Sequence, residues 1–264
     1  MRWLLVYFAL LLGGLTTMLV DGLGLFSFLV YYAGMPLGAV AVWRVSGRSI
    51  AALFRRDDVH SLWRALIGAV GAAAAVGLVF AALAALGWAA LDEPRATIGR
   101  FVLILGAQQG LVAGFEELAF RGVIQTLLVD RLGLGRGLAG AAGLFGLFHL
   151  PNLIYQDVPA SLIPVALGNL TVMGLVFGAA FERGGRRLAL PIGLHLGWNM
   201  AAYSMEDGFG LRLSGPALFT GDPAWYPESG VAALIGLALA GWLAWALTGR
   251  GARQAALRRN KRLA

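Results

Sequence analysis

Three charged side chains, Glu116, Glu117 and Arg121, stand inside an apolar run that extends from residue 101 to 129. Each charge at the centre of a membrane helix costs about 2.5–3.5 kcal/mol, so the trio must serve some purpose there. Glu117 and Arg121 are four residues apart and can pair on one helix face. Glu116 points about 100° away and has no partner within its own helix. An unpaired carboxylate inside a membrane is by default a hypothesis of function.

Two of the three histidines in the chain also lie in apolar runs. His149 belongs to one run, and His195 belongs to another run together with Asn199. Because His195 and Asn199 are four residues apart, both project from one face of a helix. We expect Pro151 and Pro191 to interrupt their spans beside these residues, which would free backbone groups and make room for water or ligand.

Glu116, His149, His195 and Asn199 together supply the groups that hydrolysis of a carbonyl compound needs. A carboxylate and an imidazole can position and deprotonate water, while a second imidazole and an amide can stabilise a developing oxyanion. Other interpretations use the same atoms: Glu116, His149 and His195 could hold a divalent metal such as zinc, and the two histidines could be axial ligands of haem. The sequence has none of the HExxH, GxSG or GxGD signatures of other intramembrane proteases.

The composition predicts a polytopic membrane protein, because 59% of the 264 residues are hydrophobic and only 13% are charged. A helix of about 20 apolar residues can cross about 30 Å of hydrocarbon. We therefore expect an all-α transmembrane helical bundle with about eight spans, near 3–20, 22–43, 65–91, 101–129, 138–153, 162–181, 188–204 and 230–248. The absence of cysteine excludes disulfides and thiolate metal ligands.

Charges in the connections between these runs alternate along the chain. The arginine-rich connections are 44–64, 130–136, 182–187 and the tail from Arg250. The acidic or neutral connections are those at Asp21, 92–100, Asp157 and 205–229. Because basic connections stay in the cytoplasm, this alternation predicts that both termini are cytoplasmic. The same arginines account for the net charge of +7 without a nucleic-acid partner.

Small residues recur at intervals of four in two of the runs. Gly106, Gly110 and Gly114 form a repeated GxxxG pattern on the fourth run, and Gly174 and Gly178 form another on the sixth. Such patterns are typical of helices that pack closely in membranes. We expect both stretches to lie against neighbouring helices.

Three motifs, in this order, resemble the CAAX-protease and bacteriocin-processing (CPBP, or Abi) family of intramembrane proteases, which includes the type II CAAX prenyl endopeptidases. The family motifs are EExxxR, FxxxH and HxxxN. They match, in that order, Glu116 to Arg121, Phe145 to His149, and His195 to Asn199. The resemblance covers about residues 98–204 and leaves out the first three spans.

The resemblance implies a role for each residue that matches a motif. Glu116 would act as general base together with His149 to activate the attacking water. His195 and Asn199 would stabilise the tetrahedral oxyanion. Supporting roles fall to three further residues, Glu117, Arg121 and Phe145. The residue set favours metal-free hydrolysis over a zinc mechanism, because asparagine is a poor zinc ligand and only two histidines and one well-placed glutamate are present.

The resemblance also suggests how the chain is organised. We expect a single membrane domain over 1–264, in which 98–204 is the catalytic CPBP core. Residues 1–97 would form an N-terminal three-helix extension, and 205–264 an outer loop, a last span and a basic cytoplasmic tail.

The leading functional hypothesis is an intramembrane endopeptidase that cleaves a peptide bond of a membrane-associated peptide or protein near the membrane surface. Because His195 lies about two turns from the basic end of its run, we expect the substrate to arrive from the cytoplasmic side. Of the 21 basic residues only Lys261 is a lysine, which is typical of a bacterial cytoplasmic membrane protein and disfavours a prenylated substrate. The alternative is a non-catalytic immunity or scaffold protein that keeps the polar residues as a structural network.

Overall fold

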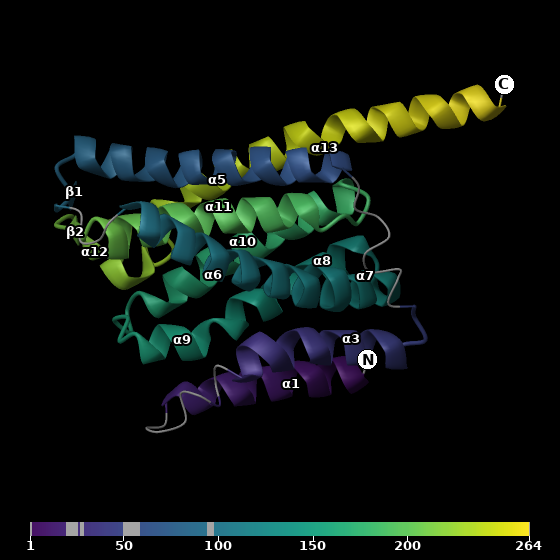
Figure 1. Ribbon diagram of the computed structural model, residues 1–264, viewed down its shortest axis with the longest axis horizontal. Helices are drawn as coiled ribbons and strands as arrows, with labels where there is room; N and C mark the ends of the chain where they lie inside the picture. The colour runs from purple at the N-terminus through teal and green to yellow at the C-terminus, as the bar shows by residue number, and fades with distance from the viewer. Residues whose placement is uncertain (1, 20–25, 27–28, 50–58, 94–97, 264) are drawn as a thin grey trace.

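The structure is a computed structural model and describes residues 2–19, 26, 29–49, 59–93 and 98–263. It is 81% helical, and its long helices lie side by side along one axis (Figure 1). The helical bundle agrees with the predicted fold class in its main feature. A short antiparallel sheet departs from the all-α prediction: β1 (Ala89–Leu91) pairs with β2 (Leu211–Leu213).

Each of the eight predicted apolar runs contains helix. The helices and their bounds, in chain order, are α1 (Arg2–Thr16), η2 (Val30–Gly34) with α3 (Met35–Val45), α5 (Val59–Ala85), α6 (Ile98–Glu117) with η3 (Leu118–Gln125) and α7 (Thr126–Leu132), α8 (Leu134–Phe148) with α9 (Leu150–Tyr155), α10 (Ile163–Arg183), α11 (Ala189–Tyr203) with η4 (Ser204–Gly208), and α13 (Ala233–Leu263). Short helical turns also occur at η1 (Thr17–Leu19), α12 (Ala217–Thr220) and η5 (Pro223–Trp225).

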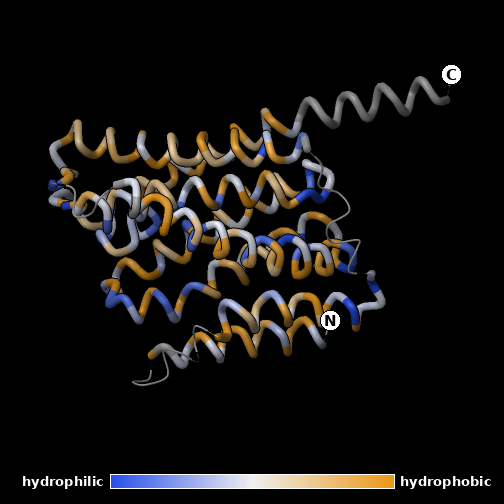
Figure 2. Tube along the Cα trace, in the orientation of Figure 1, coloured by the Kyte–Doolittle hydropathy of each residue, from blue (hydrophilic) through white to orange (hydrophobic). Residues whose placement is uncertain are grey.

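Three helical stretches within the described residues are long and apolar enough to cross a membrane, as judged by length and composition: His60–Ala85, Leu134–Tyr155 and Ile163–Arg183. Two further helices, Arg2–Thr16 and Ala233–Thr248, are apolar but shorter. Large apolar side chains remain exposed along the helices. Figure 2 shows in orange that hydrophobic residues recur along the long helices. A count of eight spans therefore stays a prediction.

Helix α11 packs closely against α5. A Cβ atom at Gly193 would lie 2.0 Å from the Ala65 carbonyl oxygen, and one at Gly197 would lie 1.9 Å from that of Ala69. No side chain fits in this space, so the two backbones touch. The helix with His195 is thus held in place by two glycines that the sequence analysis did not single out.

The two GxxxG patterns, which predicted close helix packing, differ in whether a neighbouring helix contacts them. Gly174 is packed as predicted, since a Cβ atom there would lie 2.9 Å from the Ala142 backbone. Gly178 is equally crowded by Gln125 and Leu138. The prediction is wrong for the fourth run: among the described atoms, nothing lies within 4 Å of a Cβ atom at Gly110 or Gly114. At Gly106 only Met200 comes within 4 Å, at 3.9 Å.

The two prolines also differ from each other. Pro151 opens α9 directly after the break at His149, so the predicted interruption is confirmed there. The prediction for Pro191 is wrong, because this residue lies in the first turn of α11 and the helix continues to Tyr203. A proline in the first turn removes an N–H group that has no partner in the helix, and it therefore breaks nothing.

The two ends of the bundle carry opposite charge. Asp130 lies 2.6 Å from Arg48 and 2.8 Å from Arg186, which ties the ends of α3, α7 and α10 together at one end. This basic end has the described arginines 44, 48, 64, 131, 136, 183, 186 and 187. The other, acidic end holds the small sheet and Asp92, Glu93, Asp157, Glu206, Asp207, Asp222 and Glu228. Figure 1 shows the sheet, α9 and α12 together at this end.

Candidate active site

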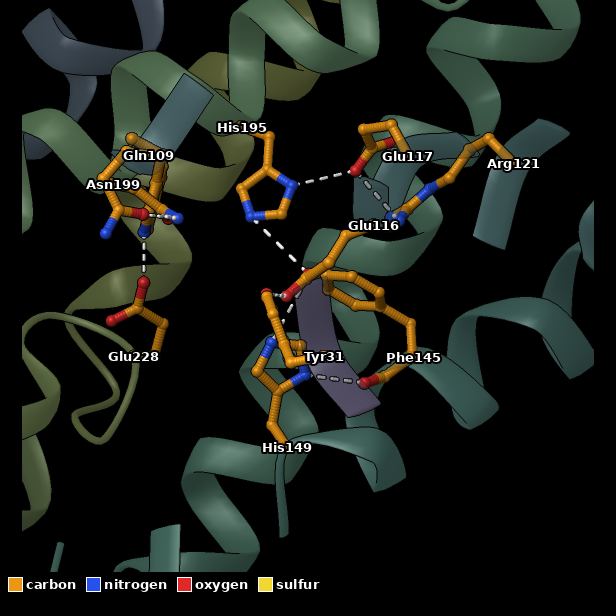
Figure 3. A network of polar contacts seen from close by, with 11 residues as sticks. Tyr31, Gln109, Glu116, Glu117, Arg121, Phe145, His149, His195, Asn199 and Glu228 are labelled. Carbon is orange, nitrogen blue, oxygen red and sulfur yellow. Dashed lines mark hydrogen bonds and ion pairs between the residues drawn. The ribbon is translucent and has the colours of Figure 1, made fainter. Parts of the chain in front are cut away.

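The polar side chains from three separate apolar runs line one cavity of about 390 Å³. Glu116 comes from α6, His149 from the break between α8 and α9, and His195 and Asn199 from α11. Figure 3 shows the two imidazoles on either side of the Glu116 carboxylate. The structure thus brings together all four residues to which the sequence analysis assigned catalytic roles.

The Glu116 carboxylate faces a nitrogen of each imidazole. Its Oε2 atom is 3.8 Å from His149 Nε2 and 3.8 Å from His195 Nε2. Glu116 is 3% exposed, and Oε2 has no hydrogen-bond partner among the described residues. A buried acceptor that is left unpaired is costly, so this oxygen is suited to a ligand rather than to packing.

The outer partners of the two imidazoles determine which nitrogen carries a proton. His149 Nδ1 is 2.8 Å from the Phe145 carbonyl oxygen, which can only accept, so Nδ1 donates. His195 Nδ1 is 3.0 Å from a carboxylate oxygen of Glu117 and donates in the same way. In the neutral form, both Nε2 atoms therefore turn a lone pair toward Glu116 Oε2. Three hydrogen-bond acceptors that converge in this way suit a molecule that donates hydrogen bonds, such as water.

Glu117 and Arg121 form the predicted pair behind the site. Arg121 Nη1 is 3.0 Å from Glu117 Oε1, and the side chains are 2% and 0% exposed. This is an ion pair by distance, without the alignment of a full hydrogen bond. The guanidinium also lies 4.2 Å from the ring centre of Phe145, which adds a cation–π contact. Glu117 thus joins Arg121 to His195 and fixes the orientation of that imidazole.

The helix geometry is irregular where these charges lie. Residues Leu118–Gln125 form η3, a π-helical segment between α6 and α7. Such wide turns are frequently found at functional sites. Here the wide turn follows directly after Glu117 and contains Arg121, so the irregular backbone lies at the paired charges.

The metal interpretation can be tested on the spacing of the possible ligands. The carboxylate and two imidazoles suit zinc chemically, and their Nδ1 atoms have the outer partners that zinc ligands often have. Ligands of one tetrahedral zinc lie roughly 3.3 Å apart, since each is about 2.0–2.1 Å from the metal. Glu116 Oε2 is 3.8 Å from each Nε2, and no described group of three or more His, Cys, Asp or Glu is placed to hold a metal. The residues as placed do not fit a metal ion.

Comparison with known proteins agrees with the motifs. The family model described as Type II CAAX prenyl endopeptidase Rce1-like matches residues 98–201. Over these residues the chain is similar to that family. The match supports a CAAX-type intramembrane protease at the level of the family. No curated protein and no solved structure matches the chain.

Tyr31 reaches the site from outside the Rce1-like segment. Its hydroxyl donates a hydrogen bond to Glu116 Oε1, and its ring stacks on Phe148 at 6.3 Å. The sequence analysis missed Tyr31, because a tyrosine in an apolar run is unremarkable and its partner is 85 positions away. The N-terminal part of the chain thus holds one oxygen of the carboxylate, and the other oxygen faces the imidazoles.

Gln109 was also missed, although the sequence carried a signal for it. It is polar, lies within the run 101–129 and precedes Glu116 by two helical turns, so both face the same side. Asn199 Nδ2 donates to Gln109 Oε1 at 2.9 Å, and Gln109 is only 4% exposed. The amide group of Asn199 has two hydrogens, so one remains for a ligand in the cavity.

Residues of the acidic connection 205–229, which follows the Rce1-like segment, also line the cavity. Trp225 and Tyr226 line it, and the Trp225 ring lies edge-on to His149 at 6.0 Å. Within the described part of the chain, neither Trp225 Nε1 nor the Tyr226 hydroxyl has a hydrogen-bond partner. Both groups are donors in a buried position, so they are available to the carbonyl groups of a peptide.

Two carboxyl groups in this loop have shifted pKa values. Burial, together with the charges of Asp207, Glu228 and Asp222, raises the pKa of Glu206 to about 8. Burial also raises the pKa of Glu228 to about 7, although a hydrogen bond from Trp198 opposes the shift. Both residues line the cavity, so two carboxyl groups with raised pKa values belong to its wall.

Proposed function

We propose that the chain is an intramembrane endopeptidase that hydrolyses a peptide bond of a membrane-associated peptide or protein. The observation that carries this proposal is the buried Glu116 Oε2, which has no partner among the described residues and is faced by two imidazole nitrogens at 3.8 Å. A water molecule at this point can donate to the carboxylate and to one imidazole at once. The resulting arrangement is that of a general base with a water nucleophile.

The reaction starts when Glu116, assisted by His149, takes a proton from the water. The water oxygen then attacks the peptide carbonyl carbon, and the carbonyl oxygen becomes an oxyanion. Asn199 stabilises the oxyanion through its second amide hydrogen, and His195 does so through Nε2 when it carries both protons. The C–N bond then breaks, and the proton held by Glu116 and His149 passes to the leaving amine. The products are a carboxylic acid and an amine, and the acid then passes its remaining proton to the amine or to water.

The proposal also includes the orientation of the chain in the membrane, the kind of membrane and the extent of the catalytic core. The chain would span the membrane eight times with both termini in the cytoplasm, and the host membrane would be the bacterial cytoplasmic membrane. Residues 98–204 would form the catalytic core, and the substrate would be a peptide or protein in or at the lipid bilayer. The arginine-rich ends of α7, α8, α10 and α11 support this orientation.

A substitution of the proposed base tests the proposal. Glu116→Gln keeps the shape of the side chain but removes the carboxylate, so cleavage of a lipidated reporter peptide should fall at least 100-fold with the protein still folded. Glu93→Gln, at an exposed position of the acidic end, is the control and should cleave at the wild-type rate. If Glu116→Gln cleaves at the wild-type rate, the proposal fails.

The type of hydrolysis is tested on the same purified protein. Elemental analysis, with reporter cleavage measured before and after treatment with a chelator, separates the two mechanisms. Activity without bound metal would assign the water to Glu116 and His149. If the protein instead holds stoichiometric zinc, and removal of the zinc also removes the activity, then zinc is bound by Glu116, His149 and His195 after their side chains rearrange.

A non-catalytic immunity or scaffold role is the second candidate, favoured by the buried Glu117–Arg121 pair, which a structural network would also contain. This role predicts that Glu116→Gln preserves the phenotype. It also predicts that Arg121→Ala abolishes folding, because the substitution leaves Glu117 buried and uncompensated at a cost of about 3–5 kcal/mol.

A further inference from the structure

We infer that the active-site cavity opens toward the acidic, non-cytoplasmic end of the bundle, so that the substrate is a peptide segment presented at that face. The nature of the substrate rests on the proposed function, but the side of the opening does not. The inference combines two independent observations, the course of the cavity along the helices and the separation of charge between the two ends.

The cavity-lining residues of each helix lie between its catalytic group and the acidic end. On α11 they run from His195 toward η4, and the full set is His195, Asn199, Ala202 and Tyr203. On α6 they run from Glu116 back toward the sheet, and the full set is Glu116, Val112, Gln109 and Gln108. On α8 and α9 the set is Phe148, His149, Asn152 and Tyr155, with Tyr155 nearest Asp157.

The cavity-lining residues of α10 and of the connection 205–229 also lie toward the acidic end. Leu170 and Met173, which line the cavity, lie in the half of α10 that starts at the acidic end. Glu206 and the loop residues Trp225 and Tyr226 also line it, and both segments belong to the acidic end. The cavity therefore extends from the catalytic groups toward the acidic end.

The opposite direction is closed by buried side chains. Arg121, Phe145 and Gln125 are each 1% exposed, and Gln125 Nε2 donates to the Gly178 carbonyl oxygen at 3.0 Å. Between the basic end and His195, α11 lies directly on α5 at Gly193. Access from the cytoplasm was expected because His195 is near the basic end, but among the described residues this packing closes that side.

The charges of the two ends indicate which face each end meets. Most of the described arginines lie at the basic end, whereas Arg100, at the start of α6, and Arg212 lie at the other. The positive-inside rule keeps arginine-rich connections in the cytoplasm and thus puts the acidic end outside. A substrate that enters there is an exported peptide or an outer segment of a membrane protein.

A labelling experiment on the full-length chain tests this orientation, and the chain contains no cysteine that would interfere. Tyr155→Cys places a thiol at the cavity mouth, and Leu134→Cys places one at the basic end of the same helical stretch. The native side chains are 57% and 56% exposed, so the two positions form a matched pair. A membrane-impermeant maleimide should label Tyr155→Cys in right-side-out vesicles and Leu134→Cys in inverted vesicles.

The opposite labelling pattern would overturn the inference, as would labelling of Tyr155→Cys in inverted vesicles alone. The labelling needs no enzymatic activity, so it remains informative if the proposed hydrolysis fails. Where the reporter is cleaved, modification of Tyr155→Cys from the outer side should reduce cleavage at least 10-fold, whereas modification of Leu134→Cys should not change it. A reporter segment exported to the outer face should be cleaved, and the same segment held in the cytoplasm should not.

Discussion

At the scale of single residues, the two oxygens of Glu116 have different environments. Oε1 accepts a hydrogen bond from Tyr31, whereas Oε2 faces the two imidazoles. The hydroxyl therefore fixes the carboxylate so that its second oxygen points at the place where water would be deprotonated. This makes Tyr31 a positioning residue for the proposed base, although it lies outside the segment that matches the family.

We expect Tyr31→Phe to lower kcat by about 10- to 100-fold while KM stays within twofold. A hydrogen bond to a charged group contributes about 1.5–3 kcal/mol, and 1.4 kcal/mol corresponds to a tenfold change in rate. The ring that stacks on Phe148 is kept, so substrate binding should not change. Steady-state kinetics on the reporter peptide measure both constants.

Tyr7→Phe is the control for loss of a tyrosine hydroxyl in the same part of the chain. Its hydroxyl donates to the Met35 carbonyl oxygen at 2.6 Å, so the variant loses a buried hydrogen bond away from the cavity. Both variants should have a lower Tm, and only Tyr31→Phe should lose kcat. Equal loss of kcat in the two variants would mean that Tyr31 acts only through stability.

At the scale of secondary-structure elements, α11 is the helix whose position matters most. It carries both His195 and Asn199, and its backbone contacts α5 at Gly193 and Gly197. Because the contacting atoms on α5 belong to the backbone, they cannot rotate away. The placement of two proposed catalytic groups therefore depends on the absence of two Cβ atoms.

Gly197→Ala should destabilise the protein by about 1–3 kcal/mol or more and lower kcat by about 100-fold. The added Cβ would lie 1.9 Å from the Ala69 carbonyl oxygen, so α11 must move away from α5. A displacement of about 1 Å at a catalytic group can cost 100-fold in rate. Thermal unfolding and reporter cleavage measure the two effects.

Gly143→Ala on α8 is the matched control, because no described atom lies within 4 Å of a Cβ atom there. An alanine in an open helical position should raise stability by up to about 1 kcal/mol. The two substitutions thus have opposite expected signs. A stabilising effect of Gly197→Ala would show that α11 and α5 are not in backbone contact.

At the scale of the whole molecule, the sequence predicted those features of the fold that depend on residue patterns within one segment. The periodic apolar runs located the helices. The fixed spacings predicted the pair of Glu117 with Arg121 and the common side of His195 and Asn199, which line one cavity. Contacts between distant segments could not be predicted, because nothing local distinguishes Tyr31 from other aromatic residues. The direction of the cavity was missed for the same reason, since it depends on which helix faces are in contact.

Packing glycines show where pattern alone misleads. GxxxG marked a real contact at Gly174 and Gly178 but not at Gly110 and Gly114, where a Cβ atom would meet no described atom within 4 Å. The pattern says that a close approach is sterically allowed. Whether a neighbour occupies that space depends on the arrangement of the whole bundle.

Asp130 joins three connections at the basic end, and its contribution to stability should depend on pH. Burial raises its pKa, but hydrogen bonds and charges from Arg48 and Arg186 outweigh this effect and lower the pKa below 3.8. A carboxyl group with a lowered pKa in the folded state stabilises the protein above its unfolded pKa. This stability is lost as pH falls through the folded value.

Asp130→Asn should therefore lower the stability at pH 7 by about 1 kcal/mol or less, because both ion pairs are partly exposed. The difference in Tm between wild type and variant should shrink as the pH falls below about 4, where the wild-type carboxyl group also becomes neutral. Asp157→Asn, at an exposed position with φ 54° that asparagine tolerates, is the control and should show no such convergence. If the difference in Tm between wild type and Asp130→Asn stays constant down to pH 3, packing and not the ion pairs holds the three connections together. The arginines at this end would then serve membrane orientation alone.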